Sequence, residues 1–168
     1  KQFPKEYKFF PETWILPTDL ADFKAQFTAS KTKQTFIVKP DNGCQGKGIF
    51  LVRDVEKVPM DFTATYVAQR YINSPYLLDG FKFDLRLYVL VTGCDPLRIL
   101  LHKHGLVRLA SEPYVEPTAK NISQAHVHLT NYAINKDNPN FEENTNPEDA
   151  SDGHKRSWEA VRDFLRKE

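Results

Sequence analysis

The run from Lys82 to Leu90 constrains the fold most, because apolar and polar side chains alternate along it. Its apolar positions are Phe83, Leu85, Leu87 and Val89, and its polar positions are Lys82, Asp84, Arg86 and Tyr88. Successive side chains of a β-strand point to opposite faces, so the alternation predicts a strand with one core face and one charged face. An ordinary solvated strand also carries charges on one face. The functional interpretation therefore depends on the surrounding motifs, which include a glycine-rich loop and other strands that end in basic residues. Together they favour a site that holds a polyanion.

The composition allows one domain of ordinary size or two small lobes. Apolar residues make up 40% of the 168 residues, and 23 Lys and Arg against 22 Asp and Glu give a net charge of +1. This balance argues against binding to nucleic acid through bulk charge. Cys44 and Cys94 match no metal or disulfide spacing, so we expect free thiols in a reducing compartment. No apolar run approaches ~18 residues and the first residues do not resemble a signal peptide, which predicts a soluble intracellular protein and no membrane partner.

Periodicity and turn residues predict the other elements. A proline-pinned extended segment covers residues 1–17, and a helix capped by Thr18 follows it. Strands are predicted at 35–39, 49–52 and 65–72. The turns near Gly93 and Gly105 predict a three-stranded antiparallel meander of 82–90, 97–102 and 106–110. Towards the end of the chain we expect a loop at 111–123, an ordered island at 128–134, a mobile polar loop at 135–153 and an amphipathic helix around 158–165.

The glycine-rich segment 41–48 lies between two predicted strands, which indicates a hairpin loop. A Walker phosphate loop would need Ser or Thr after Lys47 and then a helix, but Gly48 and a strand follow. A Rossmann fingerprint fails on glycine order and on context. A protein kinase is excluded, because the sequence contains neither His-Arg-Asp nor Asp-Phe-Gly. Two interpretations remain: a glycine-rich flap whose backbone N–H groups approach phosphates, or a plain hairpin turn.

Two further strand ends are candidate contact points. Lys39 ends the strand before the loop, where it could reach a phosphate or simply be solvated. The segment Gln69–Ile72 ends another strand and could offer backbone hydrogen bonds to an adenine edge, or be an ordinary edge. A zinc site at His102 and His104, or at His126 and His128, has no closed ligand set, so ordinary histidines are favoured.

Six motifs occur in one order and resemble the tubulin tyrosine ligase-like family of ATP-grasp ligases, most closely its polyglutamylase branch. They are Phe36–Pro40, Gly43–Ile49, Gln69–Ile72, Asp79–Arg86, Gly105–Arg108 and His128–Tyr132, and the resemblance covers roughly Phe9 to Lys136. It implies an α+β ATP-grasp fold of two lobes, 1–72 and 73–168, with mainly antiparallel sheets that sandwich ATP and an incomplete C-terminal lobe. It also implies that ATP phosphorylates a glutamate side chain of an acidic tail, and that free L-glutamate attacks the acyl phosphate to form an isopeptide bond.

The resemblance also implies residue roles. The positions that match nucleotide contacts are Lys39, Gln45, Gly46, Lys47, Gly48, Ile49, Gln69, Arg70, Tyr71, Ile72, Lys82, Asp84, Thr130 and Asn131. Lys39 and Arg86 are the candidate catalytic residues, with Arg86 placed to stabilise charge on the acyl phosphate. Gln45, Arg108 and Lys155 match substrate contacts, and Arg108 would hold the carboxylate of the incoming amino acid. For Lys155 a solvated position at the start of the last helix is an equal alternative.

The Mg²⁺ ligands of the family are an aspartate on one strand and a Glu-x-Asn on an apolar strand. Glu142-Glu143-Asn144 has that spacing but lies in a polar stretch, so we assign no metal ligand here and expect the ligands outside this chain. The implied partners are tubulin C-terminal tails or microtubules. The implied locations are the cytoplasm and cytoskeleton, with the ciliary axoneme and basal body as further candidates. Glycylation, tyrosine ligation and a non-catalytic nucleotide- or microtubule-binding module are the alternative functions.

Overall fold

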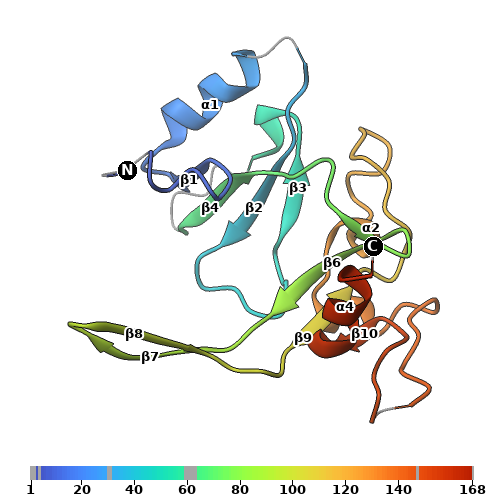
Figure 1. Cartoon of the computed structure of the whole chain (residues 1–168). Helices are drawn as coiled ribbons and strands as arrows, with labels where there is room; N and C mark the ends of the chain where they lie inside the picture. Colours follow the sequence, from blue (N-terminus) through green and yellow to red (C-terminus); the bar gives the residue numbers. More distant parts are fainter. Residues whose placement is uncertain (1–2, 4, 30–31, 59–63, 147, 168) are drawn as a thin grey trace. The chain divides into compact units, whose positions relative to one another are not determined.

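The computed structural model describes residue 3 and residues 5–29, 32–58, 64–146 and 148–167 (Figure 1). Its contacts divide the chain into two compact units. The first comprises Lys1–Pro75 and Glu116–Ala125, and the second comprises Tyr76–Val115 and His126–Glu168. Both consist mostly of antiparallel sheet with a few helices, which gives the α+β class.

The first unit is a four-stranded antiparallel sheet in the order β1-β4-β2-β3. Its strands are β1 (Thr13–Leu16), β4 (Tyr66–Arg70), β2 (Phe36–Pro40) and β3 (Phe50–Val52). A short 3₁₀ helix, η1 (Val55–Lys57), follows β3. Three of these strands lie within two residues of the predicted ranges, and β1 arises inside the predicted proline-pinned segment.

Helix α1 (Leu20–Thr28) covers one face of this sheet. Phe23 of α1 is fully buried against Trp14 of β1 and Phe36 of β2, with ring centroids 5.5 and 5.0 Å away. Burial of three large aromatic side chains supplies most of the apolar area that holds the helix on the sheet. The predicted cap is wrong: Asp19, not Thr18, is the N-cap residue, and its carboxylate accepts a hydrogen bond from the N–H of Ile15 at 2.8 Å.

The second unit contains an antiparallel sheet in the order β10-β9-β6-β5. Its strands are β10 (Lys155–Ser157), β9 (Leu106–Leu109), β6 (Phe81–Arg86) and β5 (Leu77–Leu78). Helix α4 (Trp158–Leu165) packs on one face through Val161, against Val107 and Leu109. Ser157 caps this helix by accepting the N–H of Ala160 at 3.1 Å. The final amphipathic helix is thus confirmed.

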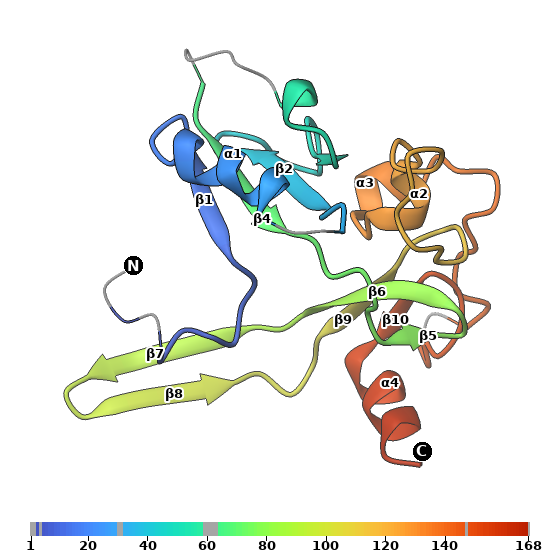
Figure 2. The same cartoon turned by 90° about the horizontal axis from the view of Figure 1, so that it is seen from above.

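The predicted continuous strand 82–90 and the predicted meander are wrong. The run splits into β6 and β7 (Val89–Cys94), and β7 pairs with β8 (Leu97–Leu101) as a separate two-stranded ribbon, while β6 pairs with β9. The ribbon extends beyond the ends of β6 and β9 (Figures 1 and 2). The split lies beside Gly105, where an added Cβ would come within 2.9 Å of the carbonyl oxygen of Arg86. β6 ends at Arg86, which forms the last pair of the β6–β9 ladder with Leu106.

Two one-turn helices, α2 (Ala125–His128) and α3 (Tyr132–Asn135), form the ordered island. Asn135 anchors it, because this fully buried amide accepts from the N–H and hydroxyl of Ser111 and donates to the carbonyls of Leu129 and Asn131. The following segment is irregular as predicted, and no described residue of 136–154 lies in a helix or strand. None of the described helices is long and apolar enough to cross a membrane.

Candidate functional site

In the first unit, the candidate residues Lys39 and Gln69 lie on the sheet face opposite α1. Lys39 and Gln69 belong to neighbouring strands, and the Lys39 ammonium donates to the Gln69 side-chain oxygen at 3.2 Å. The Gln69 amide nitrogen in turn donates to the Thr13 hydroxyl at 3.0 Å. Partial burial lowers the pKa of the Lys39 ammonium from its ordinary value. A half-buried cation with one neutral hydrogen-bond partner is poised for an anion, which would stabilise its charge.

The loop between β2 and β3 is a glycine-rich hairpin connection, as predicted. Gln45, Gly46 and Gly48 have φ values of 59°, 83° and 74°, in the left-handed region that favours glycine. Gly43 also packs closely, because an added Cβ would meet the Pro40 ring at 2.7 Å. Gln45 and Lys47 are exposed at the tip. The glycines thus serve both a tight turn and close backbone approach, and the loop conformation is compatible with either earlier interpretation.

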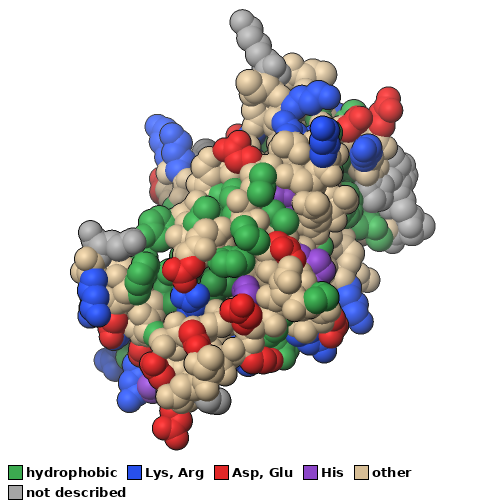
Figure 3. Space-filling model, turned by 90° about the vertical axis from the view of Figure 1, so that its right-hand side faces the viewer, with side chains coloured by type: hydrophobic (Ala, Val, Ile, Leu, Met, Phe, Trp, Pro, Cys, Tyr) green, Lys and Arg blue, Asp and Glu red, His purple; other side chains and the backbone are tan. Residues whose placement is uncertain are grey.

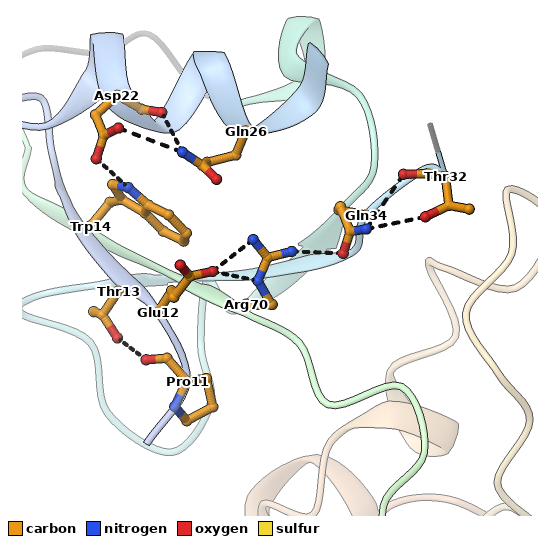
Figure 4. Close-up of polar contacts among 9 residues, drawn as sticks. All are labelled: Pro11, Glu12, Thr13, Trp14, Asp22, Gln26, Thr32, Gln34 and Arg70. Atoms are coloured by element: carbon orange, nitrogen blue, oxygen red, sulfur yellow. Dashed lines mark hydrogen bonds and ion pairs between the residues drawn. The ribbon is translucent and has the colours of Figure 1, made fainter. Parts of the chain in front are cut away.

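Arg70 points to the α1 face, away from Lys39 and Gln69. Its guanidinium bonds the Glu12 carboxylate at 2.7 Å and the Gln34 side chain at 2.6 Å (Figure 4). It also lies over the Phe36 ring. The N–H groups of Arg70 and Tyr71 donate to the carbonyls of Glu12 and Thr35. A backbone N–H contact to a base at this strand end would therefore have to come from Ile72.

In the second unit, cations gather on the sheet face opposite α4. Arg108 of β9 pairs directly with Asp84 of β6 on one side and with Lys155 of β10 on the other. Directly paired residues share a sheet face, so these three side chains form one row. Lys82 and Arg86 occupy the same face of β6, which gives four cations and one carboxylate. This excess of positive charge on one rigid face suits a ligand with several anionic groups.

Arg108 and Asp84 form a bidentate ion pair. Arg108 Nε and Nη2 donate to the two Asp84 carboxylate oxygens, each at 2.8 Å, and the side chains are 29% and 35% exposed. The Thr130 hydroxyl donates to the same carboxylate at 2.6 Å. Among the described residues, no acceptor bonds Arg108 Nη1. The outer edge of the guanidinium therefore remains available to a second carboxylate.

The other cations of this face have different surroundings. Lys82 donates to the carbonyl of His128 at 2.8 Å, and the Lys155 ammonium lies 5.3 Å from the centre of the Tyr132 ring. Arg86 is exposed at the end of β6, and its side chain forms no hydrogen bond or ion pair with any described residue. Asn131 immediately precedes α3. Its carbonyl accepts from the Asn135 side chain at 3.0 Å, whereas its own side chain, like that of Arg86, forms no hydrogen bond or ion pair with any described residue.

The sequence analysis did not predict two residues that contact candidate site residues, Thr13 and Tyr132. Thr13 positions Gln69, but β1 could not be recognised inside a segment with three prolines. Tyr132 lies under Lys155, and its only signal was its place directly after Thr130-Asn131. Lys155 itself was ambiguous, because its place beside Arg108 depends on β10, a three-residue strand formed by non-local pairing.

The described residues contain no group of three or more His, Cys, Asp or Glu side chains arranged as a candidate metal site. Glu142 and Glu143 are exposed, and Asn144 donates to the carbonyl of Asp152. Cys44 and Cys94 are free and exposed, in agreement with the prediction of free thiols. Figure 3 shows acidic, basic and hydrophobic side chains interspersed on one face of the molecule, in keeping with the balanced net charge.

The sequence profile of the family described as "Tubulin-tyrosine ligase family" matches residues 1–167. The chain belongs to this family. It is 56% identical over 167 residues to a "Probable beta-tubulin polyglutamylase" of Tetrahymena thermophila, a match that covers 98% of this chain and 14% of that protein. It is 48% identical to "Tubulin polyglutamylase TTLL13" of Mus musculus, over 99% of this chain and 20% of that protein. With "Tubulin polyglutamylase TTLL6" of Homo sapiens it shares 46% identity, over 98% and 18% respectively.

This family membership confirms the resemblance drawn from the six ordered motifs. The chain spans a fifth or less of the length of these curated relatives. The match therefore corresponds to one segment of each of these relatives.

Proposed function

We propose that the protein is an ATP-dependent ligase that adds L-glutamate to glutamate side chains of acidic protein tails. The relatives named tubulin polyglutamylase support this proposal. The observation that carries the proposal is the row of Asp84, Arg108 and Lys155 across three strands. A free glutamate has two carboxylates, whereas glycine and tyrosine have one. Two neighbouring cations, one of them a guanidinium with an open edge, match a dicarboxylic amino acid.

The first unit would contribute contacts to phosphates and base. Lys39 is half-buried, so its charge would act on a phosphate with little screening. The backbone of the glycine-rich loop, with Gln45 to Ile49, would approach phosphate oxygens, since a chain without Cβ atoms allows short N–H contacts. Ile37 and Val67 flank Gln69 on the Lys39 face and offer an apolar surface for a base.

The second unit would contribute contacts to nucleotide and amino acid. Lys82, Asp84, Thr130 and Asn131 are assigned to the nucleotide, Arg86 to the reacting carboxylate, and Arg108 and Lys155 to free glutamate. In the first step an acceptor carboxylate oxygen attacks the γ-phosphorus and ADP leaves. In the second, the glutamate amine attacks the acyl carbon, phosphate leaves with the C–O electrons, and the amine loses a proton. Arg86 would stabilise the added negative charge in both steps.

Mg²⁺ would neutralise charge on the ATP phosphates. The described residues supply no ligand cluster for it, so we derive no step from the metal. Asp84 is already held by Arg108 and Thr130 and is not assigned to the metal. The proposed acceptors are tubulin tails or microtubules, and the proposed location is accordingly the cytoskeleton, including cilia.

The test supplies the full-length gene product with ATP, Mg²⁺, a peptide rich in glutamate and an equimolar mixture of isotopically labelled glutamate, glycine and tyrosine. We expect mass spectrometry to find added glutamate and no addition to a matched peptide with glutamine in place of glutamate. Incorporation of glycine or tyrosine instead would replace the proposed substrate. Nucleotide binding without any addition would favour the non-catalytic module.

A variant sharpens the choice of amino acid. Lys155→Met removes the second cation of the row and retains much of the side-chain volume. It should lower the preference for glutamate over glycine, measured as a ratio of kcat/KM values. Lys167→Met, an exposed lysine after α4, is the matched control and should leave the ratio unchanged.

A further inference from the structure

Three side chains of the second unit form a continuous chain of charge-assisted hydrogen bonds. The Thr130 hydroxyl donates to Asp84 Oδ2 at 2.6 Å, Arg108 Nη2 donates to the same oxygen at 2.8 Å, and Arg108 Nε donates to Oδ1 at 2.8 Å. Thr130 is buried, and the two charged side chains are about one third exposed. Charge-assisted bonds of this length are among the stronger hydrogen bonds in proteins.

The geometry fixes the direction of the Arg108 guanidinium. Asp84 occupies the edge formed by Nε and Nη2, so the plane of the group is set and the edge formed by Nη1 and Nη2 faces away from Asp84. Lys82, Arg86 and Lys155 are the other cations of the face. Lys155 is directly opposite Arg108 in the strand register and the other two are one diagonal step away, so their charge repels the guanidinium. Without the carboxylate, a long side chain beside like charges would adopt other rotamers.

The three hydrogen-bonded residues Asp84, Thr130 and Arg108 are assigned to two different ligands. Under the proposed function, Asp84 and Thr130 contact the nucleotide, whereas Arg108 contacts the carboxylate of the incoming amino acid. We propose that Asp84 and Thr130 are positioning residues that couple the two ligands, so that bound nucleotide increases the affinity for glutamate. This inference rests on the proposed function.

The physical reason is that both ligands favour one arrangement of the same side chains. A nucleotide hydroxyl that donates to Asp84 holds the carboxylate in place, and the carboxylate holds Arg108 with its outer edge open. The Asp84 and Arg108 side chains are still about one third exposed, so a nucleotide contact would remove part of their remaining rotamer freedom, and glutamate would then bind to a more ordered guanidinium. Linkage makes the effect reciprocal: glutamate must tighten nucleotide binding by the same factor.

The test measures glutamate binding by calorimetry to the full-length protein, with and without a saturating non-hydrolysable ATP analogue. We expect the analogue to lower the glutamate Kd by a factor of about 5 to 150, the usual range for coupled sites. Asp84→Asn and Thr130→Val should each bring this factor close to one. Thr130→Ser, which keeps the hydroxyl, should restore it.

Asp79→Asn is the matched control. Asp79 pairs with Arg156 at 2.7 Å in the same unit, and Arg156 pairs with Val107, whose side chain belongs to the buried face. This variant removes an aspartate–arginine ion pair outside the row, and it should keep the full coupling factor.

Two results would overturn the coupling. One is a wild-type factor of one although both ligands bind. The other is an Asp84→Asn variant that weakens glutamate binding equally with and without the analogue, which would make Asp84 a static support. If the wild-type protein binds neither ligand, the proposed function itself fails, so the two failures are distinguishable.

Discussion

The two sheets are built alike but present different chemistry. Each is a four-stranded antiparallel sheet with one face covered by a helix, α1 in the first unit and α4 in the second. The open face of the first sheet carries one cation, Lys39, among neutral and apolar side chains. The open face of the second carries four cations and Asp84.

The two open faces therefore differ in the number of anionic groups that each could bind. A single half-buried lysine interacts strongly with one anionic group, because little water screens it. A row of cations on one sheet can hold several anionic groups at once, and Asp84 at the end of the row pairs with Arg108. Variants that remove one group from each face test whether the two faces bind different ligand groups.

The largest effect is expected from Arg108→Gln. Loss of the guanidinium that we propose to bind the amino-acid carboxylate should lower kcat/KM for glutamate by about 100-fold or more, mainly through KM. Arg156→Gln is the control, because Arg156 also pairs with an aspartate but lies outside the cationic row. Initial rates at varied glutamate concentration provide the measurement. Equal losses in the two variants would contradict the special role of the row.

Lys39→Met should weaken nucleotide binding by about 10- to 100-fold, the effect of one lost charge-assisted contact. It should leave the thermal midpoint unchanged or raise it, because the variant removes a charge that burial disfavours. Binding is measured by titration with an ATP analogue, and stability by thermal unfolding. A large drop in the midpoint would show that Lys39 is a structural residue. Lys24→Met is the control, because Lys24 is an exposed lysine of α1.

Gln69→Leu should have a smaller effect, a loss of nucleotide affinity of about 3- to 10-fold. The substitution leaves the Lys39 ammonium and the Thr13 hydroxyl without their shared amide partner. Gln26→Leu is the control, since Gln26 bonds only within α1. The same analogue titration measures both variants, and identical affinities for Gln69→Leu and wild type would exclude Gln69 from the nucleotide face.

The smallest expected effect is on the pH dependence of the free energy of unfolding, and it concerns His154, which is not a candidate site residue. Burial lowers the pKa of His154, whose Nδ1 accepts the N–H of Glu142 at 2.9 Å. The unfolded chain therefore binds this proton more readily, so the free energy of unfolding should fall as the pH drops below about 6.5, towards the lowered pKa. Urea unfolding at pH 5.5 and 7.5 should show a weaker pH dependence for His154→Phe than for wild type.

His102→Gln is the control for this comparison, because His102 is exposed. Its unfolding should keep the wild-type pH dependence. Phenylalanine retains the aromatic contacts of His154 with Phe81 and Phe141. A wild-type pH dependence in His154→Phe would assign the effect to other groups.

Local pattern was enough to predict most elements, whereas the resemblance to the family supplied most candidate residues. The alternation of Lys82, Asp84 and Arg86 with apolar residues placed them on one face of a strand, and glycine spacing predicted the loop after Lys39. Both predictions depend only on neighbouring residues. The ordered motifs similarly led to the family, which the profile match confirms.

Non-local pairing decided the rest. Only the register of β9 between β6 and β10 brings Asp84, Arg108 and Lys155 into one row, and no local period encodes that register. The ladder of β6 with β9 ends at Arg86, and Val89 pairs with Leu101 in a separate ribbon, although the alternation of the sequence continues through Val89. The sequence by itself determined which side chains share a strand face, because that follows from backbone geometry. The tertiary structure determined which strands meet, because that depends on contacts between residues far apart in the chain.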